Sequence, residues 1–345
     1  MAVPLRSRAT GWSRRLNPIS AILLFAAGLI IPAHAGTLLF VGDSGGGYAS
    51  LTTFDGTTGA FINQDSISGS LGFPTGVAVG PDGNVYVGDN MFGTVDRFSG
   101  TTGGFIDQFI PAGTGIDPLV SPSGLAFGPG GNLYVADYGS GGYGFVDVYS
   151  GTGTFLTQFI PPDYGPAGGL DYPNGLAFGP SGNLYITDGI NGIDVFGPTG
   201  NFLEVLVPIG SGPGLAGLSG PSGLTFGPNG NLYVADETIG VVDMFDPTTG
   251  AFLGIFGATA SLAQPVDLTF GPNGNLYVTD SQGVEEFNGT TGASMGAFIV
   301  ASSGNLSNGQ YLAFSNATPE PSTLALAALA GILGWGWRRR IWRRN

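Results

Sequence analysis

Six aspartates recur along the chain, and each ends a short run of alternating apolar residues. The clearest copy of this run is Gly230-Asn231-Leu232-Tyr233-Val234-Ala235-Asp236. The six residues, spaced by 46, 48, 51, 48 and 44 positions, are Asp43, Asp89, Asp137, Asp188, Asp236 and Asp280. Carboxylates are ligands that Ca²⁺ prefers, so a metal ring is one hypothesis. The alternative is that each aspartate ends a strand and caps the next turn by accepting backbone N–H groups.

The elements that carry these aspartates favour the capping role. Each repeat contains four strand-sized pieces, shown by 223–226, 232–236, 240–245 and 251–256, with glycine-rich turns between them. Four antiparallel strands repeated six times predict an all-β fold, a six-bladed β-propeller. The first strands line the channel and the second strands lie about 4.8 Å farther out. Six carboxylates on that wider ring cannot converge on one ion.

The two ends of the repeat region complement each other. The first period supplies only the second, third and fourth strands of a blade, from Leu38 to Ile62. The missing first strand appears at the other end as Tyr311-Leu312-Ala313-Phe314. We expect these segments to pair, which closes the ring and removes exposed sheet edges.

The repeats disagree at the channel mouth. The residue before the first-strand Leu or Val is glycine in four blades, at Gly76, Gly124, Gly175 and Gly223. It is Asp267 and Tyr311 in the other two, which are neighbours in the ring, and Gln310 and Asn174 belong to the same rim. These four polar residues are candidates for ligand binding. The alternative is sequence drift at a permissive position.

Three connections on the same face are long and irregular, at 138–143, 161–172 and 207–218. Variable loops on one rim are where repeat proteins usually bind their partners. Tyr143, Tyr164 and Tyr172 lie in them and are candidates to stack on sugars or to contact a protein. Incidental aromatic residues in solvated loops are the alternative.

Composition excludes several classes of function. The chain has no Cys and no Lys, and its single histidine is His34. Between residues 36 and 318, Arg97 is the only basic residue against 23 Asp and Glu, which argues against nucleic-acid binding. Without a His or Lys base, we assign no catalytic residues and favour binding over catalysis. We expect no cofactor, although a divalent cation held in the channel by Asp267 stays open.

The first 35 residues have the pattern of a signal peptide. Four arginines precede an apolar run from Ile19 to Ile31, and Ala33-His34-Ala35 follows as a small-x-small cleavage site. We predict cleavage after Ala35. A retained membrane anchor is the alternative.

The last 27 residues, 319–345, combine three features. Pro319-Glu320-Pro321 precedes an apolar run from Leu324 to Trp337 and then five arginines. Fourteen apolar residues make about 21 Å of helix, a short transmembrane span. This combination resembles the PEP-CTERM sorting signal. The resemblance implies export in a Gram-negative bacterium, transient inner-membrane anchoring, processing by an exosortase and association with exopolysaccharide. Whether the helix is removed or retained stays open.

The repeat itself, seen best at Gly230 to Asp236, resembles NHL repeats over residues 37–315. It departs from them in the third strand, where basic residues common in NHL repeats are replaced by Asp96, Asp147, Asp194, Asp243 and Glu285. We therefore expect residues 36–318 to form an exported propeller at the cell surface or in the extracellular matrix. Its loop-rich rim would bind a protein or polysaccharide. The alternative, suggested by six-bladed relatives, is a lyase or lactone hydrolase with a site at the channel mouth.

Overall fold

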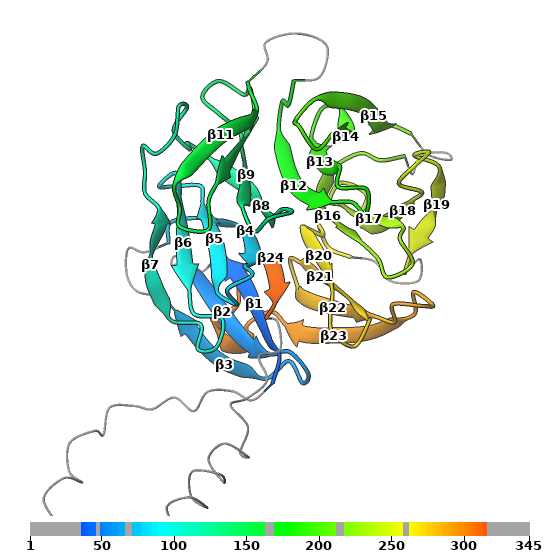
Figure 1. The fold of residues 1–345 in the computed structure, drawn as a ribbon. Coiled ribbons are helices and arrows are strands. Elements are labelled where there is room, and N and C mark those ends of the chain that lie inside the picture. The colour runs from blue at the N-terminus through cyan, green and yellow to red at the C-terminus, as the bar shows by residue number, and fades with distance from the viewer. Residues whose placement is uncertain are drawn as a thin grey trace, which may run out of the picture. The chain divides into compact units, whose positions relative to one another are not determined.

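A computed structural model describes residues 36–45, 49–65, 71–162, 169–211, 217–257 and 262–315. These residues form six four-stranded antiparallel sheets, each a blade of a propeller (Figure 1). We number the blades 1 to 6, starting with the blade that contains both ends of the repeat region. The predicted all-β six-bladed propeller is confirmed.

Each blade has the same strand order from the channel outward. The first, innermost strands are β24 (Gly309–Phe314), β4 (Pro74–Val79), β8 (Pro122–Phe127), β12 (Pro173–Phe178), β16 (Pro221–Phe226) and β20 (Asp267–Phe270). The second strands are β1 (Leu38–Asp43), β5 (Val85–Asp89), β9 (Leu133–Asp137), β13 (Leu184–Asp188), β17 (Leu232–Asp236) and β21 (Leu276–Asp280). The third strands are β2 (Ser50–Asp55), β6 (Thr94–Phe98), β10 (Phe145–Tyr149), β14 (Gly192–Phe196), β18 (Val241–Phe245) and β22 (Gly283–Phe287). The outer strands are β3 (Phe61–Asp65), β7 (Phe105–Ile110), β11 (Phe155–Ile160), β15 (Phe202–Pro208), β19 (Phe252–Phe256) and β23 (Ser294–Val300). A 3₁₀ turn, η1 (Ser303–Asn305), follows β23.

The ring closes as predicted, because β24 pairs with β1 in blade 1. Leu39 lies opposite Phe314, and the Leu38 N–H donates to Ser315 Oγ at 2.8 Å. The first strands contact one another in the cyclic order β24, β4, β8, β12, β16, β20 and back to β24. Blades 1 and 4 therefore face each other across the channel.

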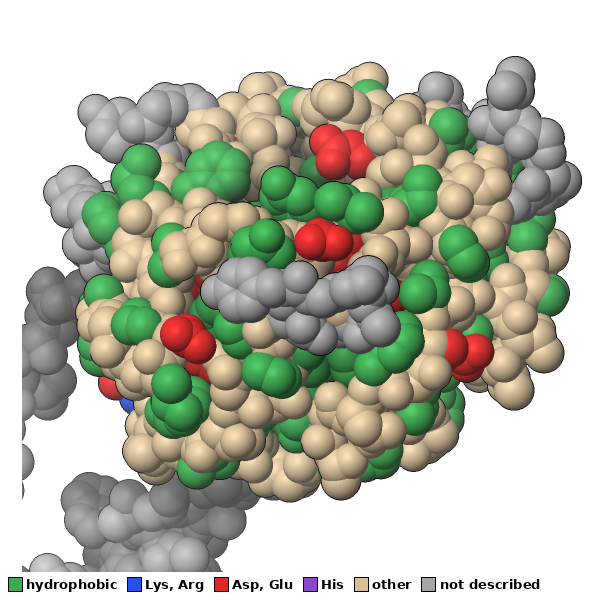
Figure 2. All heavy atoms as spheres, turned by 90° about the horizontal axis from the view of Figure 1, so that it is seen from above, with side chains coloured by type: hydrophobic (Ala, Val, Ile, Leu, Met, Phe, Trp, Pro, Cys, Tyr) green, Lys and Arg blue, Asp and Glu red, His purple; other side chains and the backbone are tan. Residues whose placement is uncertain are grey.

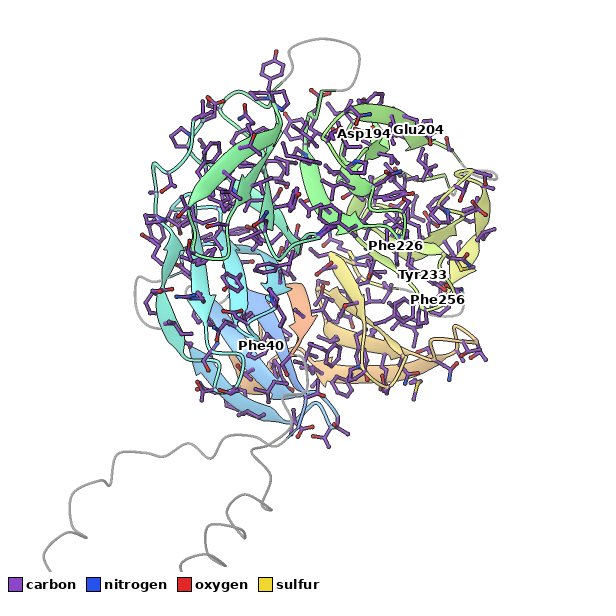
Figure 3. The ribbon with its side chains drawn as sticks, in the orientation of Figure 1. Phe40, Asp194, Glu204, Phe226, Tyr233 and Phe256 are labelled. Carbon is purple, nitrogen blue, oxygen red and sulfur yellow. The ribbon has the colours of Figure 1, made fainter. Side chains whose placement is uncertain are left out.

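Aromatic rings fill the spaces between blades. Tyr233 of β17 packs edge to face on Phe256 of its own blade, with ring centroids 5.1 Å apart (Figure 3). It packs in the same way on Phe270 of the next blade, also at 5.1 Å. The tyrosines of the other second strands repeat this contact with the next blade, as Tyr86 does with Phe127 at 4.9 Å. Each such pair contributes about 1 kcal/mol beyond its buried area.

Hydroxyl groups also join neighbouring blades beside the channel. Thr75 Oγ1 donates to the Pro122 carbonyl at 2.5 Å, and Ser123 Oγ donates to the Pro173 carbonyl at 2.6 Å. In blade 6 the hydroxyl comes from the second strand instead, where Thr279 Oγ1 donates to the Gln310 carbonyl at 2.6 Å. These bonds satisfy carbonyls on the channel edge of the first strands, which have no neighbouring strand there.

The repeated aspartates cap turns, in agreement with the structural interpretation of the sequence. Asp236 accepts from the N–H of Ile239 in the turn after its strand, at 3.0 Å. It also accepts from Ser219 at 2.7 Å and Gly220 at 3.1 Å, which lie in the connection that enters the same blade. One buried carboxylate thus fixes two loops at the same end of the blade.

Four of the five acidic residues that replace basic ones on the third strands are buried, and the fifth, Glu285, is partly exposed. Asp96, Asp147, Asp194 and Asp243 are at most 1% exposed, and each has at least one oxygen without a hydrogen-bond partner among the described residues. Asp194 is labelled in Figure 3. Burial raises the pKa of all four to about 7, and a nearby strand-end aspartate adds to the effect. At these four positions the departure from NHL repeats therefore changes the interior of the propeller and not its surface.

The surface has little charge. Figure 2 shows scattered acidic and apolar side chains among uncharged ones on the side of the molecule that is uppermost in Figure 1.

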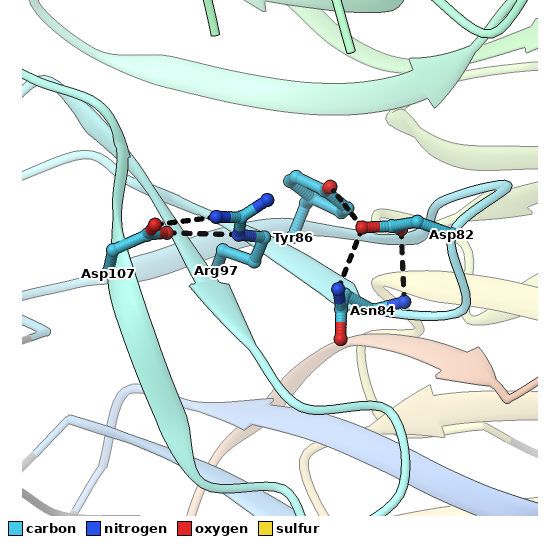
Figure 4. A network of polar contacts seen from close by, with 5 residues as sticks. All are labelled: Asp82, Asn84, Tyr86, Arg97 and Asp107. Atoms are coloured by element: carbon cyan, nitrogen blue, oxygen red, sulfur yellow. Dashed lines mark hydrogen bonds and ion pairs between the residues drawn. The ribbon is translucent and has the colours of Figure 1, made fainter. Parts of the chain in front are cut away.

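Arg97 is held on β6 by two hydrogen bonds to Asp107, from Nε to Oδ1 at 3.0 Å and from Nη2 to Oδ2 at 2.5 Å (Figure 4). The same figure shows Tyr86 donating to Asp82 at 3.0 Å. Arg97 is thus occupied by a partner on the adjacent strand.

The capping role predicts the effect of Asp236→Ala. Three backbone N–H groups lose a charged acceptor, so the free energy of unfolding should fall by about 3 kcal/mol in urea denaturation. Glu204→Ala, on the exposed face of β15, is the control and should change stability little. Equal stability of Asp236→Ala and the wild type would contradict the capping role.

The buried third-strand acids predict a pH dependence. Because the folded-state pKa of Asp243, about 7, lies above its ordinary value of 3.8, its contribution is fully present below that ordinary value and is lost as the pH rises through 7. Asp243→Asn removes this titration. Between pH 5 and pH 8 the variant should lose less stability than the wild type, by a difference on the order of 1 kcal/mol. Identical pH profiles from urea denaturation would refute the assignment.

Candidate functional site

The glycines that precede the first-strand Leu or Val are required by the close approach of neighbouring blades. A Cβ built on Gly124 would collide with the Asn174 carbonyl of β12, and one on Gly76 would collide with the Ser123 carbonyl of β8. Gly76 also has a positive φ of 38°, which disfavours other residues. Four blades therefore share one tight inner ring. The two that depart from it, with Asp267 and Tyr311, place side chains at the axis.

Asp267 is the first residue of β20 and lies against both neighbouring blades. Its Oδ2 accepts from the N–H of Leu312 on β24 at 3.1 Å. Its Oδ1 lies beside Gly223 of β16, where any side chain would displace it. Burial raises the pKa of Asp267 to about 7, and the backbone N–H groups of Leu312 and Leu268 oppose that rise.

Tyr311 crosses the channel. Its hydroxyl donates to Asn174 Oδ1 at 3.0 Å, and Asn174 belongs to β12 of blade 4, which faces blade 1. Tyr138, in the turn after β9, donates to the same oxygen at 2.8 Å. Burial raises the pKa of Tyr138 to about 12 and that of Tyr311 well above 10, so both phenols stay neutral donors at ordinary pH. We call these three residues the cross-channel bar.

The bar divides the channel into two compartments. Tyr311 lines both of them. The inner cavity has a volume of about 610 Å³ and is lined by first strands, including Asp267 of β20. The outer mouth has a volume of about 300 Å³ and lies on the face with the long connections.

Neutral polar side chains dominate the outer mouth. It is lined by five carboxamides, three hydroxyl-bearing Ser and Thr side chains, three aromatic rings, Val266 and one carboxylate, that of Glu237. The carboxamides are those of Asn90, Asn174, Gln264, Asn308 and Gln310. Gln264 has a φ of 58°, a left-handed conformation that is uncommon outside glycine and that clusters at functional sites.

The structure brings together some of the candidates from the sequence and separates others. Asn174, Gln310 and Tyr311 lie together in the outer mouth, whereas Asp267 lines the inner cavity beneath them. Tyr172 is 51% exposed and its ring centroid lies 6.2 Å from that of Tyr138, so it extends the mouth outward.

The remaining candidates lie elsewhere. Tyr143 lines a separate depression of about 200 Å³ with Asp117 and Phe145. Tyr164, the cleavage site at Ala35 and the Pro319-Glu320-Pro321 segment lie outside the described residues.

Sequence reasoning missed several residues of the outer mouth. Asn90, Tyr138, Glu237 and Ser281 each directly follow one of the capping aspartates. Because those aspartates fix the turn, the next residue faces the channel axis in four blades. Aligning the repeats one position farther would have found them.

Metal binding remains a prediction without a test. Among the described residues, no group of three or more Asp, Glu or His side chains is arranged to hold an ion. In the inner cavity Asp267 is the single described carboxylate. The expectation of no cofactor, and the alternative of a divalent cation at Asp267, both stand as stated.

Comparison with protein families concerns the C-terminal segment. Residues 317–340 match the model of the PEP-CTERM protein-sorting motif. The chain carries a PEP-CTERM sorting signal. This signal marks proteins that Gram-negative bacteria export and sort to the cell envelope, with processing by an exosortase. None of the curated proteins matches the sequence.

Solved structures support the fold. The chain is similar to a chain of the nidogen/laminin complex, with 20% identity, a TM-score of 0.63, and coverage of 82% of this chain and 100% of that one. It is also similar to a catalytically inactive virginiamycin B lyase from Staphylococcus aureus with quinupristin (18% identity, TM-score 0.53, coverage 78% and 87%). A gluconolactonase from Xanthomonas campestris is similar with 16% identity and a TM-score of 0.52, over 69% of this chain and 78% of that one. Identities this low show a shared fold alone.

Among the residues that the structure describes, no helix is long and apolar enough to cross a membrane. The apolar run from Leu324 to Trp337, which we expect to span the membrane, lies outside them.

The cross-channel bar predicts coupling between its two tyrosines. Tyr311→Phe and Tyr138→Phe each leave Asn174 Oδ1 with one donor, so each should lower the free energy of unfolding by about 1 kcal/mol. The double variant leaves that acceptor with neither donor and should lose about 1 kcal/mol more than the sum. Tyr149→Phe, whose hydroxyl bonds to Asp147 elsewhere, is the control partner and should be additive with Tyr138→Phe. Additivity of the first pair would show that the bar is not a unit.

Proposed function

We propose that this protein is exported to the cell surface or the extracellular matrix and there binds a neutral polysaccharide at the outer mouth. The observation that carries the proposal is the set of five carboxamides that line that mouth, of which Asn174 already accepts from the two tyrosines of the bar. A carboxamide presents a donor and an acceptor side by side. That pairing suits sugar hydroxyls, which both donate and accept.

Charge favours a neutral chain over an anionic one. The region from 36 to 318 carries one arginine against 23 acidic residues, and that arginine is bonded to Asp107. Glu237 adds a negative charge to the mouth itself. An anionic polysaccharide would be repelled both by the overall field and at the site.

Exposed aromatic rings border the mouth. Phe73 is 41% exposed and lines it, and Tyr172 is 51% exposed beside Tyr138. Such rings present flat apolar faces on which the C–H face of a sugar packs. Tyr143, in its separate depression, would contact only a longer chain that extends beyond the mouth.

The sorting signal gives the place of action. Cleavage after Ala35, transient anchoring by the C-terminal helix and exosortase processing would release or fix the propeller where exopolysaccharide accumulates. A protein partner at the same rim is the competing occupant, in line with the nidogen/laminin relative.

Catalysis is the second candidate, of the lyase or lactone hydrolase type. The observation that favours it is Asp267, whose burial raises its pKa to about 7, beside Tyr311. One carboxylate without a His or Lys partner is a limited catalytic set.

The proposal predicts selective binding in affinity electrophoresis. Neutral glucans such as dextran or a β-glucan should retard the purified protein, and alginate should not. Gln310→Ala, Asn308→Ala and Tyr172→Ala should each weaken glucan binding about fivefold, as expected for the loss of one contact of about 1 kcal/mol.

Gln108→Ala on the outer strand β7, whose side chain is exposed, is the matched control and should bind like the wild type. Binding that is equal in all variants would contradict the site. A protein captured at the mouth without any glucan binding would favour the protein partner, and release of new sugar ends would favour catalysis.

A further inference from the structure

The inner cavity is a second site, separate from the outer mouth. Its volume of about 610 Å³ falls within the range of small-molecule pockets. The cross-channel bar closes it on one side. On the other it reaches the turn between β20 and β21, where Gly271 and Pro272 line it, and Ser315, which directly follows β24.

The walls of this cavity combine apolar side chains with polar backbone groups of the first strands, and they are held rigidly. Val, Leu and Ala side chains of the first strands line its length, and Phe127, Phe178, Phe270 and Phe314 lie at the strand ends near the turns. Each of these four rings is fixed edge to face on a tyrosine of the preceding blade, with centroids 4.8 to 5.1 Å apart. Figure 1 shows the first strands gathered around the channel axis.

Asp267 lies at the closed end, beneath the bar. Apart from Tyr311, it is the only ionisable residue among those that line the cavity. Its Oδ2 accepts from the Leu312 N–H at 3.1 Å, and the Leu268 N–H also stabilises the carboxylate. Phe270 follows three residues later on β20, which places it about 10 Å along the strand.

Among the described residues the carboxylate has no positive partner. Arg97, the one basic residue of the propeller, is bonded to Asp107 on the adjacent outer strand of blade 2. A buried carboxylate without a counter-ion is costly, so a ligand that supplies one is favoured. The acidic surface of the propeller attracts cations toward the opening.

We propose that the inner cavity binds a small organic cation with an apolar body and one ammonium group. The ammonium donates to the Asp267 carboxylate, and the body packs on the first-strand side chains. The phenylalanines at the opening present ring faces and edges that suit an apolar or aromatic body and attract its charge on entry. A metal ion would need several more oxygen ligands than one carboxylate supplies. An anion would meet only Asp267.

The test compares three ligands that share a phenyl ring and carry a positive, a neutral or a negative polar group. Benzylamine, benzyl alcohol and benzoate are titrated into the purified protein at pH 8 by isothermal calorimetry. Benzylamine should bind at least tenfold more tightly than benzyl alcohol, and benzoate should not bind. Asp267→Asn should remove the preference for the amine and leave the weak binding of the alcohol.

Glu237→Gln is the matched control, because it removes the carboxylate of the outer mouth on the other side of the bar and should leave amine binding unchanged. Thermal melting checks that both variants fold. Three results would overturn the proposal: no amine binding at millimolar concentration, equal affinity for amine and alcohol, or an Asp267→Asn variant that keeps the preference. Failure here leaves the glucan experiment unaffected, because the two sites lie on opposite sides of the bar.

Discussion

The strand-end aspartates hold the two loops of each blade at the channel. Each accepts backbone N–H groups from the turn that follows it, and also from the connection that leads into the first strand of the same blade. In blade 1 this second partner is distant in sequence: Asp43 accepts from Ser307 at 3.0 Å and Asn308 at 2.9 Å, 264 and 265 residues away. The interaction that organises every blade therefore also closes the ring. Burying a carboxylate is tolerable here because several N–H groups donate to it.

The positions of the channel side chains follow from the hydrogen bonds that these aspartates accept. Residues directly after an anchored aspartate, such as Tyr138 and Glu237, are carried on a fixed turn, and Gln310 precedes the channel-lining part of β24. Their backbones are held by the same interaction in every blade, so side chains can vary without loss of the fold. At one such variable position Tyr311 replaces glycine, and its hydroxyl donates a hydrogen bond to Asn174 on the facing blade. One hydrogen-bonded bar thus makes two compartments of different character from a single channel.

The sequence predicts most of the fold, because its signals are local and repeated. Four strands per repeat and glycines at fixed turns are visible without any tertiary information, and the missing first strand of blade 1 indicates how the ring closes. The capping role of Asp236 also follows from its place at a strand end. The sequence does not show that Asp96, Asp147, Asp194 and Asp243 face inward, since acidic residues on a strand usually face solvent.

The site is predicted in part. The break in the glycine pattern at Asp267 and Tyr311 is visible by comparing repeats. The hydrogen bond from Tyr311 to Asn174 cannot be predicted from the sequence, because it depends on the diameter of the ring of blades and on the length of the tyrosine side chain. The same geometry places Asp267 on one side of the bar and the carboxamides of Asn308 and Gln310 on the other. The spacing of residues in the sequence does not predict this division.

A crystal structure of the protein soaked with a neutral glucan oligosaccharide would test the central claim most directly. We predict a sugar ring in the outer mouth, above Tyr311 and within hydrogen-bond distance of the carboxamides of Asn308 and Gln310. A sugar bound only on the outer strands of the blades, or one lying in the inner cavity beside Asp267, would contradict it.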